Sequence, residues 1–403
     1  MEPALQFVLL FSAATAVAIA TRWLRVPYTV ALVLGGLALG ALPLASRPHL
    51  TRDLLFAVAL PGLLFEAAVH LREDDLAGST LGIAALAVPG IVVILAATAP
   101  LMHALVPRLA LIDALAFAAA TVATDPIAVV ATFREVNAPR RLAALVEGES
   151  LFNDGTGVVV FNLVVAAAAG AALSLGSAAL QFVLVSAGGA LVGGVLALVI
   201  VAVLRKAFDP MIEVTLTVIA AYGSFALAER VHASGVIAAV VAGLVCGRAG
   251  RRGVPASLDV LHTFWEYVAF ALNSIVFLLI GLEVKPLALL RDWAAILLAY
   301  AVVTGVRFAV VFGTAALLRR TRERQPWRWT VVASWSGLRG ALAMVLALSV
   351  PESFRARNLI IHLTFGVVLL SIVVQGLTMG KLLRWLRVAE PVSDPAKTAA
   401  PPA

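Results

Sequence analysis

Cysteine and charge are both scarce in this sequence of 403 residues. The single cysteine, Cys246, cannot form an internal disulfide, and no group of Cys and His residues has the spacing of a metal site. Redox chemistry and soft-metal binding are therefore not expected. Charged residues make up 13% of the chain, and the largest hydrophilic insert, residues 319–328, is too short to fold as a separate soluble domain.

Apolar residues, in contrast, are abundant. They make up 62% of the chain, and apolar runs close to the roughly 20 residues that a membrane-spanning helix needs recur from end to end. The opening run, residues 4–20, has no basic segment before it, so we expect a retained span rather than a signal peptide. The expected spans, thirteen in all, cover residues 4–21, 27–45, 52–71, 79–104, 110–133, 142–168, 177–204, 210–228, 232–247, 260–284, 293–318, 328–350 and 358–384.

The net charge of +7 does not indicate nucleic-acid binding. The basic residues form short clusters between apolar segments, and most fall in alternate loops, as the positive-inside rule requires. This asymmetry predicts a multi-pass protein of the cell (inner) membrane, with its N-terminus outside and its C-terminus in the cytoplasm. Residues 1–388 would form the transmembrane domain, and the Pro-rich residues 389–403 a disordered cytoplasmic tail.

Four charged side chains fall near the middle of their expected spans. A charge at that depth costs about 2.5–3.5 kcal/mol, so each needs a partner, a cavity or a function. One further carboxylate, Glu149, lies about one turn from Asp154 on the same expected helix. The four central residues are Asp125, Asp154, Arg307 and Arg339.

Two of these charges sit where a helix should break. Pro126 follows Asp125, lacks an N–H and disfavours helical angles at Asp125, so it fits the first position of a new half-helix capped by Asp125 or Thr124. Gly337 and Gly340 flank Arg339 and weaken the helix there. Broken helices near the bilayer centre are typical of transporter binding sites. An ordinary proline kink is the alternative for the first break.

The positions of the two breaks suggest an internal symmetry. They lie in the fifth and twelfth spans, seven apart, so they could occupy matching places in inverted repeats. The predicted fold is therefore an all-α polytopic membrane protein of about 13 transmembrane helices. It would be built from inverted repeats whose two broken helices cross at the midplane.

The segment EGESLFNDG, residues 147–155, supplies the chemistry. Ser150 and Asp154 are four residues apart on one helix face and can point at the first break, leaving Glu149 to meet an arginine such as Arg339. A buried carboxylate without a partner takes up a proton, and a hydrated cation would displace that proton. Carboxylate, hydroxyl and carbonyl oxygens suit a hard cation. The alternative is a structural polar cluster that joins helices.

The same residues resemble a known family. ATDPIAVVATFREVNAPRRLAALVEGESLFNDGTGVVVF, residues 123–161, is similar to the paired signature of monovalent cation/proton antiporters of the sodium/proton exchanger type. Residues 26–40, 60–71 and 336–348 resemble other segments of that family in the expected order. The similarity extends over most of the chain.

The resemblance implies thirteen helices, with spans 4–6 and 11–13 as an ion-translocating core that moves against spans 1–3 and 7–10, a dimerising scaffold. It implies Na⁺ ligation with Asp154 as the carrier of proton or cation, and an ion pair between Glu149 and Arg339. Arg307 would be a structural partner. Asn153 stands where electrogenic relatives have a second aspartate, which implies electroneutral one-for-one exchange. The full implied ligand set is the Thr124 carbonyl, Asp125, Glu149, Ser150 and Asp154.

The resulting hypothesis is a homodimeric antiporter, not an enzyme, that exchanges a monovalent cation, with Na⁺ favoured, for H⁺ by alternating access and without a cofactor. The lipid bilayer is its expected surrounding. A K⁺/H⁺ antiporter of the same fold remains an alternative. An intramembrane aspartyl protease would need facing aspartates such as Asp125 and Asp154, but the sequence has no GxGD segment. A passive channel is disfavoured by the central ion pair and the titratable carboxylates.

Overall fold

The computed structural model of the protein describes residues 3–388, except 25–26, 41–53, 73–75, 172–173, 207–208, 253–257 and 284–285. The described residues are helical or irregular, and none of them forms a strand, which confirms the predicted all-α class. The predicted tail, residues 389–403, lies outside the described residues.

The first half of the chain forms helices that follow the expected apolar stretches closely. They are α1 Pro3–Leu24, α2 Tyr28–Gly40, η1 Leu54–Ala59, α3 Leu60–His70, α5 Thr80–Ala85, η2 Leu86–Gly90, α6 Ile91–Leu105, α7 Leu111–Ala120, α8 Ile127–Glu135, α9 Arg140–Ala168 and α10 Leu175–Leu204.

The second half continues in the same way. Its helices are α11 Pro210–Val218, η3 Ile219–Gly223, α12 Ser224–Arg230, α13 Gly235–Gly250, α14 Leu258–Glu283, α15 Pro286–Arg291, α16 Trp293–Leu317, η4 Leu318–Arg320, α17 Trp327–Trp335, α18 Ala341–Leu348, α19 Arg357–Leu370, η5 Ser371–Gln375 and α20 Gly376–Trp385.

Several of these elements join into longer helices. Within the described residues, seven continuous helices are long and apolar enough to cross a bilayer, and five further apolar helices are shorter. The protein is therefore a multi-pass membrane protein. The total of thirteen spans and the inverted repeat stay predictions.

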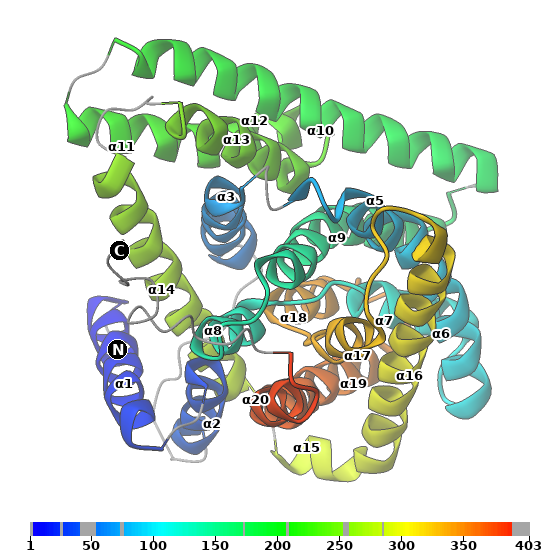
Figure 1. Cartoon of the computed structure of the whole chain (residues 1–403). Coiled ribbons are helices and arrows are strands. Elements are labelled where there is room, and N and C mark those ends of the chain that lie inside the picture. The colour runs from blue at the N-terminus through cyan, green and yellow to red at the C-terminus, as the bar shows by residue number, and fades with distance from the viewer. Residues whose placement is uncertain are drawn as a thin grey trace, which may run out of the picture.

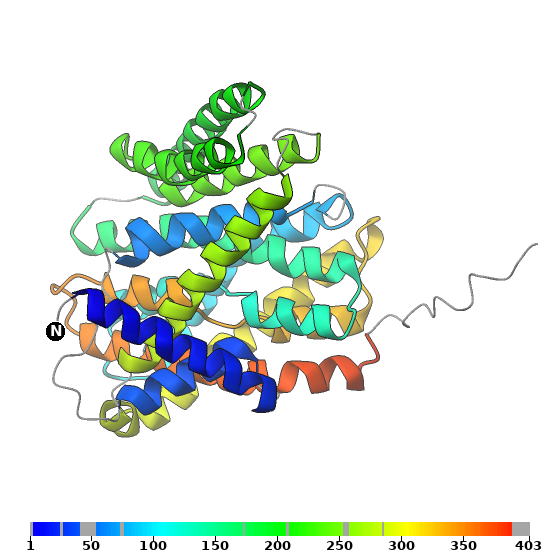
Figure 2. The same cartoon turned by 90° about the vertical axis from the view of Figure 1, so that its left-hand side faces the viewer.

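The helices form a bundle in which α7, α8, α9, α17 and α18 gather near the centre (Figure 1). Helix α10 runs along one edge and packs on α13, while α14 packs on α2 and α3. On the other side, α16 packs on α6, α17 and α19. The beginning of α1 and the end of α20 lie at opposite ends of the bundle (Figure 2).

Small residues allow close contacts between neighbouring helices. A side chain at Gly36 would place its Cβ 2.1 Å from the Leu278 carbonyl oxygen, and one at Gly193 would come 2.1 Å from the Ala238 carbonyl oxygen. Such close backbone approach strengthens packing in lipid, where the hydrophobic effect does not drive helices together. The glycine patterns thus position α2 against α14 and α10 against α13.

Candidate functional site at two helix breaks

The helix that contains Asp125 breaks at its centre, as predicted. Helix α7 ends at Ala120, α8 begins at Ile127, and the six residues between them are not helical. The backbone N–H of Ile127 donates to Asp125 Oδ1 at 3.0 Å, so Asp125 caps the second half-helix. Pro126 occupies the N-cap position of α8 instead of the predicted first helical position. This is a shift of one residue, and the proline still lacks the N–H that a helix start leaves unused.

The second break lies directly against the first. Helix α17 ends at Trp335 and α18 begins at Ala341, and the Asp125 N–H donates to the Leu338 carbonyl at 2.8 Å. A Cβ at Gly340 would lie 2.1 Å from Asp125 Oδ2. Only glycine at this position lets the aspartate approach so closely. The predicted juxtaposition of the two breaks is therefore present.

Helix α9 presents Ser150 and Asn153 to the first break. The Ser150 hydroxyl donates to the Thr124 carbonyl, which confirms that this helix face points at the break. The Asn153 amide accepts from the Thr124 N–H at 3.2 Å and donates to Thr124 Oγ1 at 2.8 Å and to Glu149 Oε1 at 2.9 Å. Asn153 therefore links the open backbone to the carboxylate on its own helix, a role that the sequence did not reveal.

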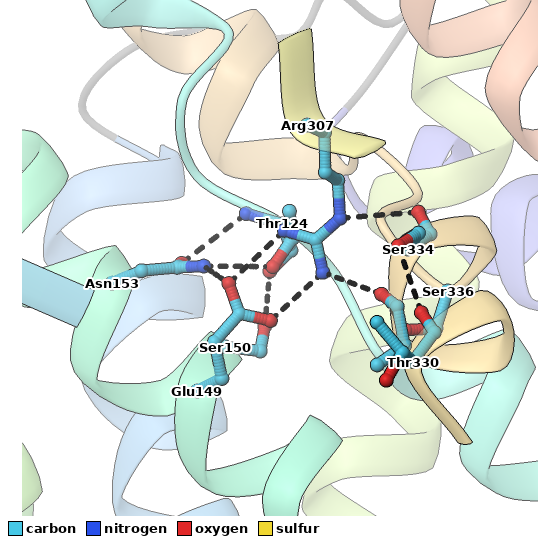
Figure 3. Close-up of polar contacts among 9 residues, drawn as sticks. Thr124, Glu149, Ser150, Asn153, Arg307, Thr330, Ser334 and Ser336 are labelled. Atoms are coloured by element: carbon cyan, nitrogen blue, oxygen red, sulfur yellow. Dashed lines mark hydrogen bonds and ion pairs between the residues drawn. The ribbon is translucent and has the colours of Figure 1, made fainter. Parts of the chain in front are cut away.

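A bidentate ion pair lies at the centre of the site (Figure 3). Arg307, on α16, donates from Nη1 to Glu149 Oε1 at 3.1 Å and from Nη2 to Glu149 Oε2 at 2.9 Å. The same guanidinium donates to the carbonyls of Ala333 at 3.0 Å and Ser334 at 3.3 Å. Those carbonyls belong to the last turn of α17, where a helix attracts a positive charge. Both Arg307 and Glu149 are buried.

The predicted pair between Glu149 and Arg339 is wrong. Arg339 is 1% exposed, and its three side-chain nitrogens have no hydrogen-bond partner among the described residues. Its backbone N–H donates to Ser371 Oγ at 3.0 Å, which fixes the break but leaves the side chain unpaired. Gly337 helps to explain why Arg307 and not Arg339 pairs with Glu149, because a Cβ at position 337 would lie 2.0 Å from Arg307 Nε. The missing side chain leaves space for the Arg307 guanidinium.

The sequence did contain a signal for Arg307. It lies in the middle of an apolar span, at the same depth as the second break, and its interpretation as a structural partner agrees with the ion pair. The sequence could not show which of two central arginines reaches Glu149. That choice depends on the packing of α16 against α17, which carries the two carbonyls that also accept from Arg307.

Asp154 differs from the other acidic residues of the site. Its side chain is half-buried, it interacts electrostatically with Asp125 and Glu149, and within the described residues it accepts no hydrogen bond and forms no ion pair. Asp125 is also half-buried and keeps one oxygen, Oδ2, outside its capping bond. In the described part of the chain, no three His, Cys, Asp or Glu side chains converge closely enough to hold a metal ion. The site thus combines one satisfied carboxylate with two that can accept a new partner.

The chain is similar to known proteins over nearly its whole length, and not only at the site. The Na⁺/H⁺ antiporter NhaS2 of Synechocystis is 35% identical to this chain, in a match that covers 95% of the chain and 71% of the relative. The Na⁺/H⁺ antiporter NhaH of Halobacillus aidingensis is 35% identical, with 96% and 98% covered. The Na⁺/H⁺ antiporter NhaP of Pseudomonas aeruginosa is 37% identical, with 84% and 82% covered.

The fold also matches a solved structure. The sodium proton antiporter MjNhaP1 from Methanocaldococcus jannaschii superposes with a TM-score of 0.80 at 20% identity, over 97% of this chain and all of that one. A family model described as "Sodium/hydrogen exchanger, transmembrane" matches residues 8–385, which include both helix breaks and all the polar residues around them. The protein is accordingly a member of the sodium/hydrogen exchanger family.

Proposed function

We propose that this protein exchanges Na⁺ for H⁺ across the membrane, with Asp154 as the group that carries either ion. Family membership and the three relatives named as Na⁺/H⁺ antiporters support the reaction. The observation that carries the role of Asp154 is its environment: a half-buried carboxylate, unpaired among the described residues, beside an ion pair that is fully satisfied.

Competition between the two ions follows from the cost of charge in this environment. A bare carboxylate in an apolar bundle is unfavourable, and either a proton or a bound cation neutralises it. The two ions use the same oxygens, so they cannot bind together. Exchange results if a loaded site can face either side of the membrane and an empty charged site cannot.

The proposed cation ligands are the carboxylates of Asp154 and Asp125, the Thr124 carbonyl and the Ser150 hydroxyl. All four supply oxygen, as a hard monovalent cation prefers, and Ser150 already contacts Thr124. Both oxygens of Glu149 accept from Arg307. We therefore assign Glu149, which the sequence placed among the ligands, to holding α9 against α16 and α17.

We propose electroneutral one-for-one exchange. Asn153 cannot titrate, and its amide is fully engaged with Thr124 and Glu149. The positive charge of Arg307 balances the negative charge of Glu149, so neither adds to the charge that moves. One carrier carboxylate then exchanges one proton for one cation.

The larger arrangement stays a proposal as well. A core of the helices around the two breaks, α5 to α9 and α16 to α20, would move against a scaffold of α1 to α3 and α10 to α14 through which two copies dimerise. The long helix α10 packs closely on α13, and α13 packs closely on α3, as a rigid scaffold requires. The basic loops predict that the N-terminus is outside and the C-terminus in the cytoplasm of a cell whose inner membrane holds the protein.

Purified protein in liposomes tests the function. A pH gradient is imposed, its decay is followed with a pH-sensitive dye, and Na⁺, Li⁺ or K⁺ is added in turn. We expect Na⁺ to dissipate the gradient, and a voltage clamp by potassium and valinomycin in the Na⁺ and Li⁺ experiments to leave the rate unchanged. A current without obligatory proton movement would indicate a channel. A response to K⁺ alone would support the K⁺/H⁺ alternative.

A further inference from the structure

A cavity of about 640 Å³ lies away from the helix breaks, at the junction of α15, α16 and α19. Four basic side chains line it, together with one carboxylate, one amide and apolar groups. The lining residues include Arg108, Leu287, Arg291, Asp292, Arg355 and His362. The proposed transport mechanism uses none of them.

The single carboxylate of this cavity is already neutralised. Asp292 is 7% exposed and accepts from Arg108 Nη2 at 3.0 Å and from His362 Nδ1 at 3.1 Å. These contacts tie the turn after α6 to the start of α16 and to α19. Asp292 is the only acidic side chain that lines the cavity in the described part of the chain, so it cannot also compensate the other arginines.

Two guanidinium groups are therefore left for a ligand. Arg291 and Arg355 are both exposed. They lie on two different segments that line the cavity, Arg291 at the end of α15 and Arg355 in the loop before α19. Neither forms an ion pair or a side-chain hydrogen bond with another described residue. Guanidinium groups bind phosphate through paired N–H donors more strongly than neutral donors do. The cavity therefore has the charge and the donors to accept a phosphate.

The apolar surroundings indicate how that phosphate is presented. Helix α15 lies at the rim of the bundle beside the start of α16 (Figure 1), where Leu287 and Leu290 are 82% and 68% exposed. Trp293, at the first position of α16, is also exposed, and tryptophan is enriched at the boundary between headgroups and hydrocarbon. Acyl chains could lie on this surface while a headgroup enters the cavity.

We propose that this cavity binds the phosphate of an anionic phospholipid headgroup, held by Arg291 and Arg355, with the acyl chains on the exposed leucines of α15. Basic pockets between transmembrane helices on the cytoplasmic side accept such headgroups, and the same pairing of guanidinium with phosphate applies to this pocket, which the predicted topology places on the outer side. Free phosphate offers the same charge, so the experiment must distinguish a lipid from an aqueous anion. The proposal depends on this cavity alone and would stand or fall independently of the transported ion.

The test measures binding to the purified full-length chain in detergent. Phosphatidylglycerol, phosphatidylcholine or inorganic phosphate is titrated in, and thermal stabilisation gives the apparent affinity. We expect phosphatidylglycerol to stabilise the protein more than phosphatidylcholine does, and inorganic phosphate to have little effect. The double variant Arg291→Gln/Arg355→Gln should bind phosphatidylglycerol about ten-fold more weakly, because two charge-assisted contacts are lost.

A matched control removes two arginines from the end of α16 that lies away from the cavity. Arg319 and Arg320 follow α16, are exposed and do not line the cavity, so Arg319→Gln/Arg320→Gln should bind as the unmodified protein does. If both double variants lost the same affinity for phosphatidylglycerol, the loss would come from the lower net positive charge and not from the cavity, and the proposal would be overturned. Equal stabilisation by the two lipids would also overturn it. Strong stabilisation by inorganic phosphate, abolished in the Arg291/Arg355 variant, would keep the phosphate site and reject the lipid as its source.

Discussion

The polar site has two halves that differ in one respect. In the paired half, Glu149, Asn153 and Arg307 satisfy one another through short hydrogen bonds. In the unpaired half, Asp154 and the guanidinium of Arg339 have no hydrogen-bond partner among the residues described. Both halves lie beside the helix breaks, within the same apolar bundle.

The difference separates stability from chemistry. A fully satisfied ion pair has nothing left to exchange, so it can hold helices but cannot carry ions. An unpaired carboxylate is costly, and in the proposed mechanism it is retained because it binds and releases a partner. The paired half should therefore affect mainly the folded state, and the unpaired half mainly transport.

The largest effect expected is on transport, from Asp154→Asn. The amide can neither release a proton nor balance a cation, so exchange in liposomes should fall by about a hundred-fold or more, a loss of roughly 2.7 kcal/mol or more. The melting temperature should stay within the range of the unmodified protein. Asp209→Asn is the matched control, because Asp209 is exposed, caps α11 and can be replaced by another good capping residue. Exchange at a near-normal rate in Asp154→Asn would remove that residue from its role.

The largest effect on stability should come from Arg307→Met. Removing one partner of a buried pair leaves Glu149 charged and unpaired, which costs about 3–5 kcal/mol. Arg339→Met removes a buried charge that has no hydrogen-bond partner among the described residues and attracts Glu149 only electrostatically, so it should lower the stability much less. Thermal melting of the two variants in the same detergent makes the comparison. Equal destabilisation would show that Arg339 is paired after all.

A smaller effect is expected from Gly337→Ala. The new Cβ would meet Arg307 2.0 Å from its Nε, and the guanidinium must shift away from Glu149. Overpacking of this kind costs about 1–3 kcal/mol. Gly305→Ala on α16 is the control, because nothing lies within 4 Å of a Cβ there. A melting temperature unchanged by Gly337→Ala would mean that the ion pair tolerates a different approach of the two helices.

The smallest effect concerns a paired carboxylate outside the membrane-spanning segments. Burial of Asp292 alone would raise its pKa, but hydrogen bonds from His362 and Arg108 outweigh burial and hold the pKa below its ordinary value. The charged form therefore stabilises the fold above the ordinary pKa of about 3.9, and this stabilisation disappears as the pH falls through the lower folded value. Because Arg108 is mostly exposed, the contribution should be about 1 kcal/mol at most.

Melting curves of the unmodified protein and Asp292→Asn, recorded from neutral to acid pH, test this expectation. The unmodified protein should be the more stable of the two at neutral pH, and the difference should vanish under acid conditions. A constant difference at every pH would attribute the role of Asp292 to packing instead of charge.

Much of the site follows from single residues in the sequence. Pro126 lacks an N–H and had to interrupt a helix, and Gly337 and Gly340 marked the second interruption. The four-residue spacing of Ser150 and Asp154 placed both on one face of α9, and the contact of Ser150 with Thr124 confirms that this face meets the break. These features depend on local backbone chemistry and helix periodicity, which a sequence fixes before any packing occurs.

Tertiary structure alone decided the partner of Glu149. Arg307 and Arg339 are both arginines near the centre of a span, and no local rule ranks them. Packing of α16 against α17 gave Arg307 two helix carbonyls to which it donates, and the absence of a side chain at Gly337 left space for its guanidinium. The backbone N–H of Arg339 instead donates to Ser371 and holds the second break in place. Which charges meet depends on distances between helices, and these arise only when the whole bundle is assembled.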